Sequence, residues 1–144
     1  MASSLGKVAL PLPPSANRYW RTFRGRTVRS AEANSWLELA AQAIRRNILA
    51  TTLPVHVRIG IRNGKGFRIN SDIDNYVKVT LDALVPEKRH AETDQITKHG
   101  AGIVPDDSAQ YVQCIEVSLL PEIKQSKTMR GEAEVIVEVF RLEG

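Results

Sequence analysis

The chain has very little cysteine and no long apolar run. Its 144 residues include one cysteine, Cys114, which excludes an internal disulfide and a cysteine-rich zinc site. No apolar stretch approaches the roughly 20 residues that a membrane-spanning helix needs, and residues 1–14 lack the pattern of a signal peptide. We therefore expect a protein that has no membrane partner and is located in the cytoplasm. Because Cys114 falls on a predicted strand, we expect it to be a small buried apolar residue.

Acidic residues are scarce in the first half of the chain. Residues 1–70 contain twelve Lys or Arg against two Glu, whereas residues 71–144 contain eight Lys or Arg against fourteen Asp or Glu. Such asymmetry indicates an anionic partner, with nucleic acid as the first candidate. The alternative is that a basic half folds against an acidic half, and charge alone does not separate the two.

The apolar residues that are present follow helix and strand periods. Three- and four-residue steps predict a helix from its N-cap Ser30 to about Ala50, and a second helix from about Asp72 to Leu84. The buried face of the second helix is predicted to comprise Ile73, Tyr76, Val77, Leu81 and Leu84. Period-two alternation predicts strands at 7–12, 55–61, 111–120 and 133–142. We expect one small α/β (α+β) domain over residues 1–144, with a mixed sheet of about four strands packed with two main helices.

Four charged residues gather at the second predicted helix. Asp74, Lys78 and Asp82 are four residues apart, so they lie in one stripe on a helix. Asp72 joins that stripe only if it precedes the helix with an extended backbone. The alternative for Asp72 is an N-cap, and the alternative for the stripe is a salt-bridged solvated face.

A second acidic feature, Asp106-Asp107, lies at the mouth of the strand predicted over 111–120. Adjacent side chains of an extended chain point to opposite sides, so one of the two is expected to face Asp72 and Asp74. Three carboxylates repel one another unless a cation lies between them. Mg²⁺, held by carboxylates and completed by water and phosphate oxygens, supplies such a cation and can activate water for phosphodiester hydrolysis.

Four segments, in this order, resemble the RusA-type crossover junction endodeoxyribonucleases. They are LPLPPSANRYWR (10–21), GRTVRS (25–30), DIDNYVKVTLDAL (72–84) and PDDS (105–108). The third is similar to the family's Asp-x-Asp-Asn-x-x-Lys motif followed by Asp-Ala-Leu, and the fourth to its downstream paired aspartates. The stretch between Leu84 and Asp106 is longer than is usual in the family, and we interpret residues 85–105 as a loop insertion.

The resemblance implies a RusA-like, Mg²⁺-dependent homodimer, with Mn²⁺ as a possible substitute. Such a protein binds branched DNA, in particular four-way (Holliday) junctions, and nicks two opposed strands symmetrically in recombination and repair. Carried over residue by residue, it implies metal binding by Asp72, Asp74 and Asp107, and a catalytic role for these three and Lys78. Asp106 is the alternative if the register of the pair differs. We interpret Asp82 as structural support outside the metal site.

Basic residues interleaved with aromatic ones predict contact with DNA. The family motif and its surroundings contribute Arg18, Arg21, Arg24 and Arg26, and the segment before the aspartates contributes Lys65 and Arg68. Arginines suit phosphates, and aromatic rings suit stacking on unpaired bases. The alternative for Tyr19 and Trp20 is an anchoring role in the core, which we expect for at least one of them. The alternative for the whole chain is a non-catalytic branched-DNA-binding module on the same scaffold.

Overall fold

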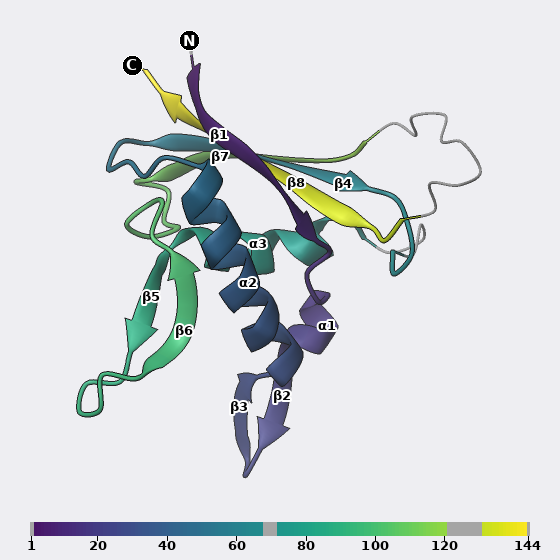
Figure 1. Ribbon diagram of the computed structural model, residues 1–144, viewed down its shortest axis with the longest axis vertical. Coiled ribbons are helices and arrows are strands. Elements are labelled where there is room, and N and C mark those ends of the chain that lie inside the picture. Colours follow the sequence, from purple (N-terminus) through teal and green to yellow (C-terminus); the bar gives the residue numbers. More distant parts are fainter. Residues whose placement is uncertain (1, 68–71, 121–130, 144) are drawn as a thin grey trace.

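A four-stranded mixed sheet forms the centre of the molecule (Figure 1). The computed structural model describes residues 2–67, 72–120 and 131–143. The strands of the sheet are β1 (Ala2–Pro11), β4 (Val55–Arg62), β7 (Val112–Leu119) and β8 (Glu134–Leu142). Their order is β1–β8–β4–β7, with β8 antiparallel to both of its neighbours and β4 parallel to β7. The predicted small α+β domain with a mixed four-stranded sheet is confirmed.

The two central strands alternate as their sequences predict. Val55, Val57, Ile59 and Ile61 of β4 are fully buried on one face, together with Val135, Val137 and Val139 of β8. The opposite face carries charge, where Arg58 forms ion pairs with Glu116 at 3.3 Å and with Glu138 at 3.8 Å. Burying each Val or Ile side chain contributes roughly 1.5–3 kcal/mol, so the apolar face fixes the register of the sheet.

Helix α2 (Ala31–Asn47) covers the apolar face (Figure 1). Ser30 caps it as predicted, because its Oγ accepts a hydrogen bond from the Ala33 amide at 3.1 Å. The indole of Trp36 donates to the Pro11 carbonyl at 2.8 Å and ties the helix to the end of β1. Within the described ranges, no helix combines the length and the apolar character needed to cross a lipid bilayer.

The second predicted helix consists of a 3₁₀ turn, η1 (Ile73–Tyr76), which continues into α3 (Val77–Leu84). Tyr76, Leu81 and Leu84 are buried as predicted. The prediction for Ile73 is wrong: it is 38% exposed, because the tighter 3₁₀ turn does not follow the 3.6-residue period. Val77 is half-buried, and Val79 is buried in its place.

Two β-hairpins project from the helical side of the sheet (Figure 1). The first follows α1 (Ala16–Tyr19) and pairs β2 (Trp20–Phe23) with β3 (Arg26–Arg29). The second pairs β5 (Pro86–Arg89) with β6 (Ile96–Ala101).

The second hairpin lies where a loop was predicted over 85–105, so that prediction is wrong. Its strands are short, charged and irregular in register, and no period-two signal results. Its base is tightly packed, since a Cβ added at Gly100 would lie 2.1 Å from the carbonyl oxygen of Val85.

Cys114 is exposed, which contradicts the predicted buried position. The pairing of β4 with β7 shifts between Val55 and His56, so Val112 pairs with Val55 while Cys114, two residues on, pairs with His56. The extra residue in β7 turns Cys114 toward the polar face that His56 shares, and the residue pattern of a single strand does not reveal such a bulge.

Candidate active site

The connection between the parallel strands β4 and β7 carries the predicted acidic residues and Lys78. It contains η1, α3 and the β5–β6 hairpin, and it ends with the turn that holds Asp106 and Asp107. Because β7 contacts η1, the two ends of this connection meet beside the sheet.

Asp72 and Asp74 lie at the entrance to η1, and both are exposed. Asp72 has an extended backbone, with φ −71° and ψ 133°, which is the conformation that places it ahead of the helix. Asp72 occupies the N-cap position of η1, but its carboxylate makes no capping hydrogen bond and is therefore not used by the turn. Both carboxylates therefore face solvent beside the start of α3.

The ammonium of Lys78 links two carboxylates. Its Nζ donates to Asp107 Oδ2 at 2.9 Å and lies 3.1 Å from Asp82 Oδ1. The hydrogen bond with Asp107 raises the pKa of Lys78, and the same bond lowers the pKa of Asp107. The pair is thus ionised at neutral pH, and it joins the first turn of α3 to the turn before β7.

The structure separates the two adjacent aspartates. Asp106 is exposed, and its Oδ1 accepts a hydrogen bond from the backbone amide of Ser108 at 2.7 Å. Asp107 is half-buried and faces Lys78. Of the pair, Asp107 is the residue that shares a site with Lys78.

A buried polar network supports Lys78 from below. Asp82 is 7% exposed and accepts a 2.6 Å hydrogen bond from the hydroxyl of Tyr19, which is itself 1% exposed. Arg29 Nε donates to the same hydroxyl at 3.1 Å. Burial, followed by the hydrogen bond to Asp82, raises the pKa of Tyr19, so the phenol stays protonated and remains a donor. Asp82 has the supporting position expected of it, and Tyr19 is the aromatic residue that anchors the N-terminal segment.

Lys98 belongs to this network and was not predicted. It comes from β6, is 3% exposed, and donates from Nζ to the backbone carbonyl oxygens of Asp82 and His99. Burial lowers the pKa of Lys98 to about 8. In the sequence it resembles any lysine of a polar loop, and no signal there points to its burial.

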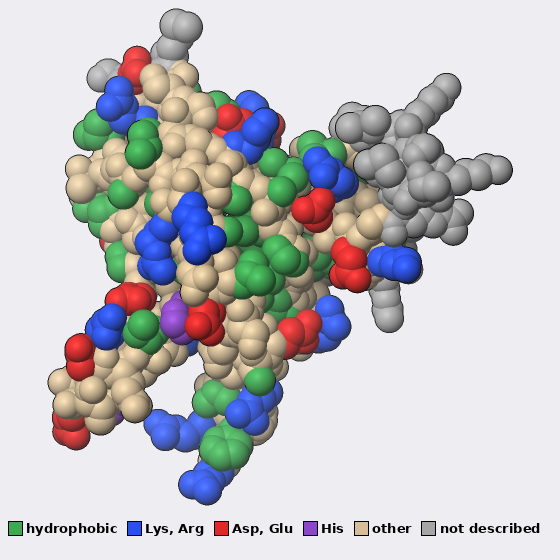
Figure 2. Space-filling model, in the orientation of Figure 1, with side chains coloured by type: hydrophobic (Ala, Val, Ile, Leu, Met, Phe, Trp, Pro, Cys, Tyr) green, Lys and Arg blue, Asp and Glu red, His purple; other side chains and the backbone are tan. Residues whose placement is uncertain are grey.

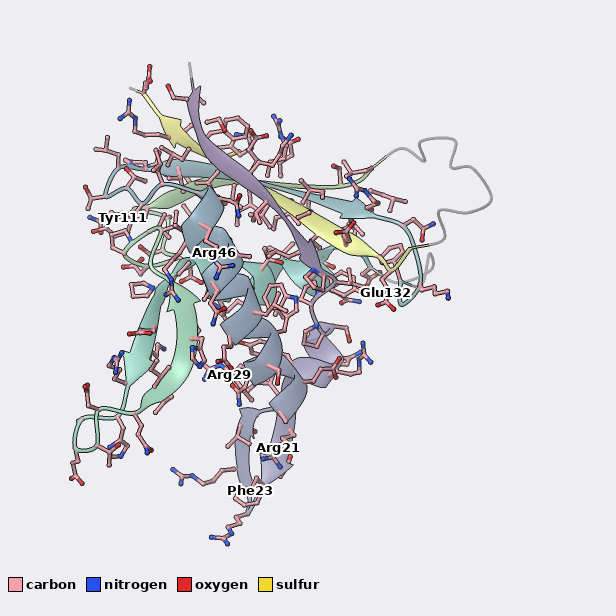
Figure 3. The ribbon with its side chains drawn as sticks, viewed as in Figure 1. Arg21, Phe23, Arg29, Arg46, Tyr111 and Glu132 are labelled. Atoms are coloured by element: carbon pink, nitrogen blue, oxygen red, sulfur yellow. The ribbon has the colours of Figure 1, made fainter. Side chains whose placement is uncertain are left out.

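The predicted DNA-contacting residues fall into two groups. Arg18 lies on α1 and forms an ion pair with Glu32 at 3.7 Å, while Arg21, Arg24 and Arg26 lie on the β2–β3 hairpin. Figure 3 shows Arg21 there. None of these three hairpin arginines forms an ion pair with an acidic residue in the described ranges.

The second group precedes η1. Lys65 is exposed, and its backbone pairs with the segment before β8, where its amide donates to the Gly131 carbonyl at 3.1 Å. Phe67 packs its ring near that of Tyr76, with centroids 6.2 Å apart, which places this segment beside η1. Arg68 lies outside the described residues.

The donor set fits a hard divalent ion in chemistry but is not gathered around one point. Carboxylate oxygens, such as those of Asp72, Asp74 and Asp107, are the ligands that Mg²⁺ prefers. Among the residues described, no three Asp, Glu, His or Cys side chains lie close enough together to hold a metal ion. Asp107 is engaged by Lys78 instead. The predicted metal site stays a prediction.

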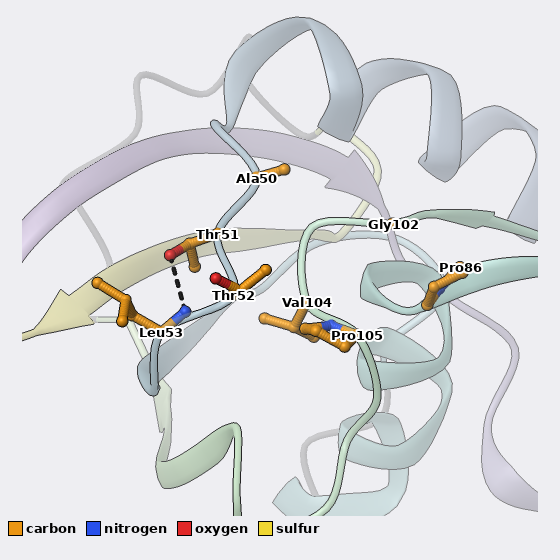
Figure 4. A pocket seen from close by; sticks show the side chains of 8 residues that line it. All are labelled: Ala50, Thr51, Thr52, Leu53, Pro86, Gly102, Val104 and Pro105. Atoms are coloured by element: carbon orange, nitrogen blue, oxygen red, sulfur yellow. Dashed lines mark hydrogen bonds between the residues drawn. The ribbon is translucent and has the colours of Figure 1, made fainter.

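A shallow pocket elsewhere on the molecule has no chemistry of this kind (Figure 4). It lies between the segment after α2 and the end of the β5–β6 hairpin, and is lined by Ala50, Thr51, Thr52, Leu53, Pro86, Gly102, Val104 and Pro105. None of these side chains is titratable, and the Thr51 hydroxyl is occupied by the amide of Leu53 at 3.1 Å.

The candidate site therefore combines an Asp-x-Asp segment with a lysine that is held by a distant aspartate. All of these residues lie on the connection between β4 and β7 of one α+β domain. The family described as Endodeoxyribonuclease RusA matches residues 11–139, and the chain belongs to that family. The resemblance carried by the four sequence segments is thereby confirmed.

Individual proteins that are similar to this chain have the same family name. The crossover junction endodeoxyribonuclease RusA of Escherichia coli strain K12 is 40% identical over 77 residues, which cover 54% of this chain and 64% of the relative. The protein of the same name from Enterobacteria phage 82 is also 40% identical over 77 residues, and that of Shigella sonnei is 39% identical. The chain thus covers slightly less than two thirds of the length of these relatives.

Proposed function

We propose that this protein is a Mg²⁺-dependent, structure-specific endonuclease that resolves four-way DNA junctions by paired, symmetric phosphodiester hydrolysis. The observation that carries the proposal is the Lys78–Asp107 pair, which links the helix after Asp72 and Asp74 to the turn before β7. The names of the RusA relatives support the substrate class. DNA recombination or repair in the cytoplasm of a bacterial cell is the setting that this activity implies.

In this proposal Asp72, Asp74 and Asp107 would hold the ion. A bound Mg²⁺ supplies charge neutralisation at the phosphate and a more acidic water. Lys78 is a cation that is already in place, and once it releases Asp107 it can approach a phosphate oxygen. Asp82 retains its contact with Lys78 at 3.1 Å and so restricts where the ammonium can move. The basic residues at 18–26 and Lys65 hold the DNA backbone.

The test is cleavage of an end-labelled synthetic four-way junction, with Mg²⁺ and with EDTA. We expect paired nicks in two opposed strands, which need Mg²⁺ or Mn²⁺ and disappear in Asp74→Asn. Asp94→Asn is the matched control, because Asp94 is an exposed aspartate in the turn of the β5–β6 hairpin and asparagine tolerates its left-handed φ of 59°. Loss of cleavage in both variants would show that the effect is not specific to this site.

One observation favours a second candidate, a non-catalytic branched-DNA-binding module. Among the described residues, no three carboxylates lie close enough together to hold a metal ion. Tight junction binding without cleavage by the unmodified protein, in either Mg²⁺ or Mn²⁺, would favour this module and overturn the nuclease.

A further inference from the structure

The tip of the β2–β3 hairpin presents an aromatic ring in a rigid setting. Phe23 pairs with Arg26 across a two-residue turn, Arg24-Gly25, in which both residues have positive φ of 51° and 73°. Such turns match the right-handed twist of the strands and hold a hairpin closed. Nothing lies within 4 Å of a Cβ added at Gly25, so the tip stands in open solvent.

Each face of the hairpin combines one aromatic ring with arginine. Strand alternation places Arg21 and Phe23 on one face, where the guanidinium groups of Arg21 and Arg24 each lie 5.2 Å from the centre of the Phe23 ring. On the other face Arg29 lies 5.5 Å from the ring of Trp20. Figure 3 shows Arg21 and Phe23 at the tip and Arg29 near the base of the hairpin.

The two faces of the β2–β3 hairpin differ in the residues that their aromatic rings contact. Arg29 is tied to the Tyr19 hydroxyl, and Trp20 packs edge-on to Tyr19 with ring centres 4.9 Å apart. That face is continuous with the network beneath Lys78. Phe23 and Trp20 are almost equally exposed, at 47% and 46%, but Trp20 packs against buried Tyr19 whereas Phe23 lies next to the open turn and contacts Arg21 and Arg24.

The charge of the hairpin selects the kind of partner. Residues 20–29 contain four arginines and no acidic residue. Figure 2 shows blue and green side chains together at this tip, with the red ones lying on other parts of the same face. A polyanion with flat apolar groups complements such a surface, and nucleic acid with unpaired bases has both features.

We propose that the β2–β3 hairpin enters the branch point of the junction and that Phe23 stacks on a base exposed there. The arginines beside the ring, Arg21 and Arg24, bind the flanking phosphates. This inference rests on the proposed function, because it assigns the recognition of the branch point to one named side chain. The ring is 47% exposed, and two guanidinium groups lie 5.2 Å from its centre, so it has little freedom of movement left to lose when a base stacks on its open surface.

The first test measures affinity without cleavage, by gel shift in EDTA, for a four-way junction and for linear duplex of the same sequence. We expect Phe23→Ala to bind the junction about tenfold or more weakly, which is the typical effect of removing one base–aromatic stack, and to bind duplex unchanged. Phe23→Leu keeps an apolar side chain but has no ring to stack, so it should bind the junction as weakly as Phe23→Ala. Phe23→Trp should bind the junction as tightly as the unmodified protein does. The control is Leu49→Ala, an apolar side chain 70% exposed just beyond the C-terminal end of α2, the end of that helix opposite to the hairpin.

A second measurement separates stacking from charge. Phe23→Ala should leave the dependence of log affinity on log salt unchanged, whereas Arg24→Ala should reduce its slope by about 1, as for one lost phosphate contact. A 2-aminopurine at the branch point should change in fluorescence when the unmodified protein binds and not when Phe23→Ala binds. An unchanged salt dependence together with a lost fluorescence change in Phe23→Ala would show that the Phe23 ring stacks on a base.

Several outcomes would overturn the proposal. Equal junction affinity for Phe23→Ala and the unmodified protein would remove Phe23 from recognition, even if the junction is cleaved. Equal losses on junction and duplex would make it a general DNA contact. If the unmodified protein binds no DNA but binds polyglutamate, the partner is an acidic protein surface, and the proposed function fails together with this inference.

Discussion

Tyr19 connects the arginine-rich hairpin with the lysine of the candidate site. Its hydroxyl donates to Asp82 at 2.6 Å and accepts from Arg29 at 3.1 Å, while the other oxygen of Asp82 holds Lys78 at 3.1 Å. Tyr19 does not face the substrate side, since it is fully buried. It acts through Asp82, as a positioning residue.

Replacing Tyr19 by phenylalanine should lower the cleavage rate and leave junction affinity unchanged. The ring still fills its place in the core, but buried Asp82 loses a donor, and Lys78 loses a fixed partner. A hydrogen bond to a charged group contributes about 1.5–3 kcal/mol, which sets the expected decrease in the free energy of unfolding. Urea unfolding measures the stability, and single-turnover cleavage at saturating protein measures the rate.

Tyr111→Phe is the matched control for this substitution. Tyr111 is half-buried before β7, away from the network (Figure 3), and its hydroxyl makes no hydrogen bond within the described residues. An unchanged cleavage rate in Tyr19→Phe, with the expected loss of stability, would show that Tyr19 is structural alone.

At the scale of elements, the β5–β6 hairpin is fastened to both neighbouring helices. Lys98 donates to the Asp82 carbonyl of α3, and Arg45 of α2 donates to the Gly100 carbonyl at 3.1 Å. The ammonium of Lys98 faces Asp82 on α3, with Arg29, Lys88 and Lys78 as the nearby cations. Burial opposes its charge, so fastening the hairpin in this way costs stability whenever Lys98 is protonated.

The free-energy cost of burying charged Lys98 decreases as the pH rises. The pKa of Lys98 is lowered from 10.5 to about 8 by folding. Below pH 8 both the folded and the unfolded chain carry the charge, and the cost is present in full. Between pH 8 and 10.5 the unfolded chain binds more protons than the folded one, so the contribution of Lys98 to stability rises with pH, by at most about 1.4 kcal/mol per pH unit.

Lys98→Met should remove this pH dependence, because methionine keeps much of the apolar stem and has no charge. We expect the stability of the unmodified protein to rise relative to Lys98→Met between pH 8 and 10, measured by urea unfolding at each pH. Other groups that titrate in this range are present in both proteins and cancel in the difference. Curves that stay parallel over this interval would mean that Lys98 does not titrate there.

At the scale of the whole molecule, the sequence predicted those parts whose side-chain period is regular. The helix capped by Ser30 and strands β4 and β8 have a clear apolar face, and the structure contains them close to the predicted positions. Asp72 and Lys78 were singled out by spacing and resemblance, and Asp72 has the extended backbone that is the condition for it to join the charged stripe.

What the sequence did not predict depends on contacts between distant segments. The burial of Lys98 follows from the docking of a hairpin whose own strands are too short and irregular to show a period. The exposure of Cys114 follows from a bulge in one edge strand, and Asp107 is distinguished from Asp106 by a lysine 29 residues away. None of these outcomes is encoded locally, so neither propensity nor spacing contains the information.

The symmetry of the proposed substrate bears on the number of subunits. A four-way junction has two equivalent strands, and a two-fold dimer places one site on each, whereas a monomer has a single Lys78 site for both. We therefore expect a homodimer in solution, detected by light scattering after size exclusion, and coupled cleavage of the two strands.

Mixed subunits test the coupling directly. A supercoiled plasmid with an extruded cruciform becomes linear when both strands are cut within one binding event, and becomes a nicked circle when only one is cut. Refolding the unmodified protein together with Asp74→Asn should produce mixed dimers, and nicked circles should accumulate that neither parent protein gives alone. If linear product instead falls simply in proportion to the unmodified protein, with no excess of nicked circles, the subunits act alone and the dimer is wrong.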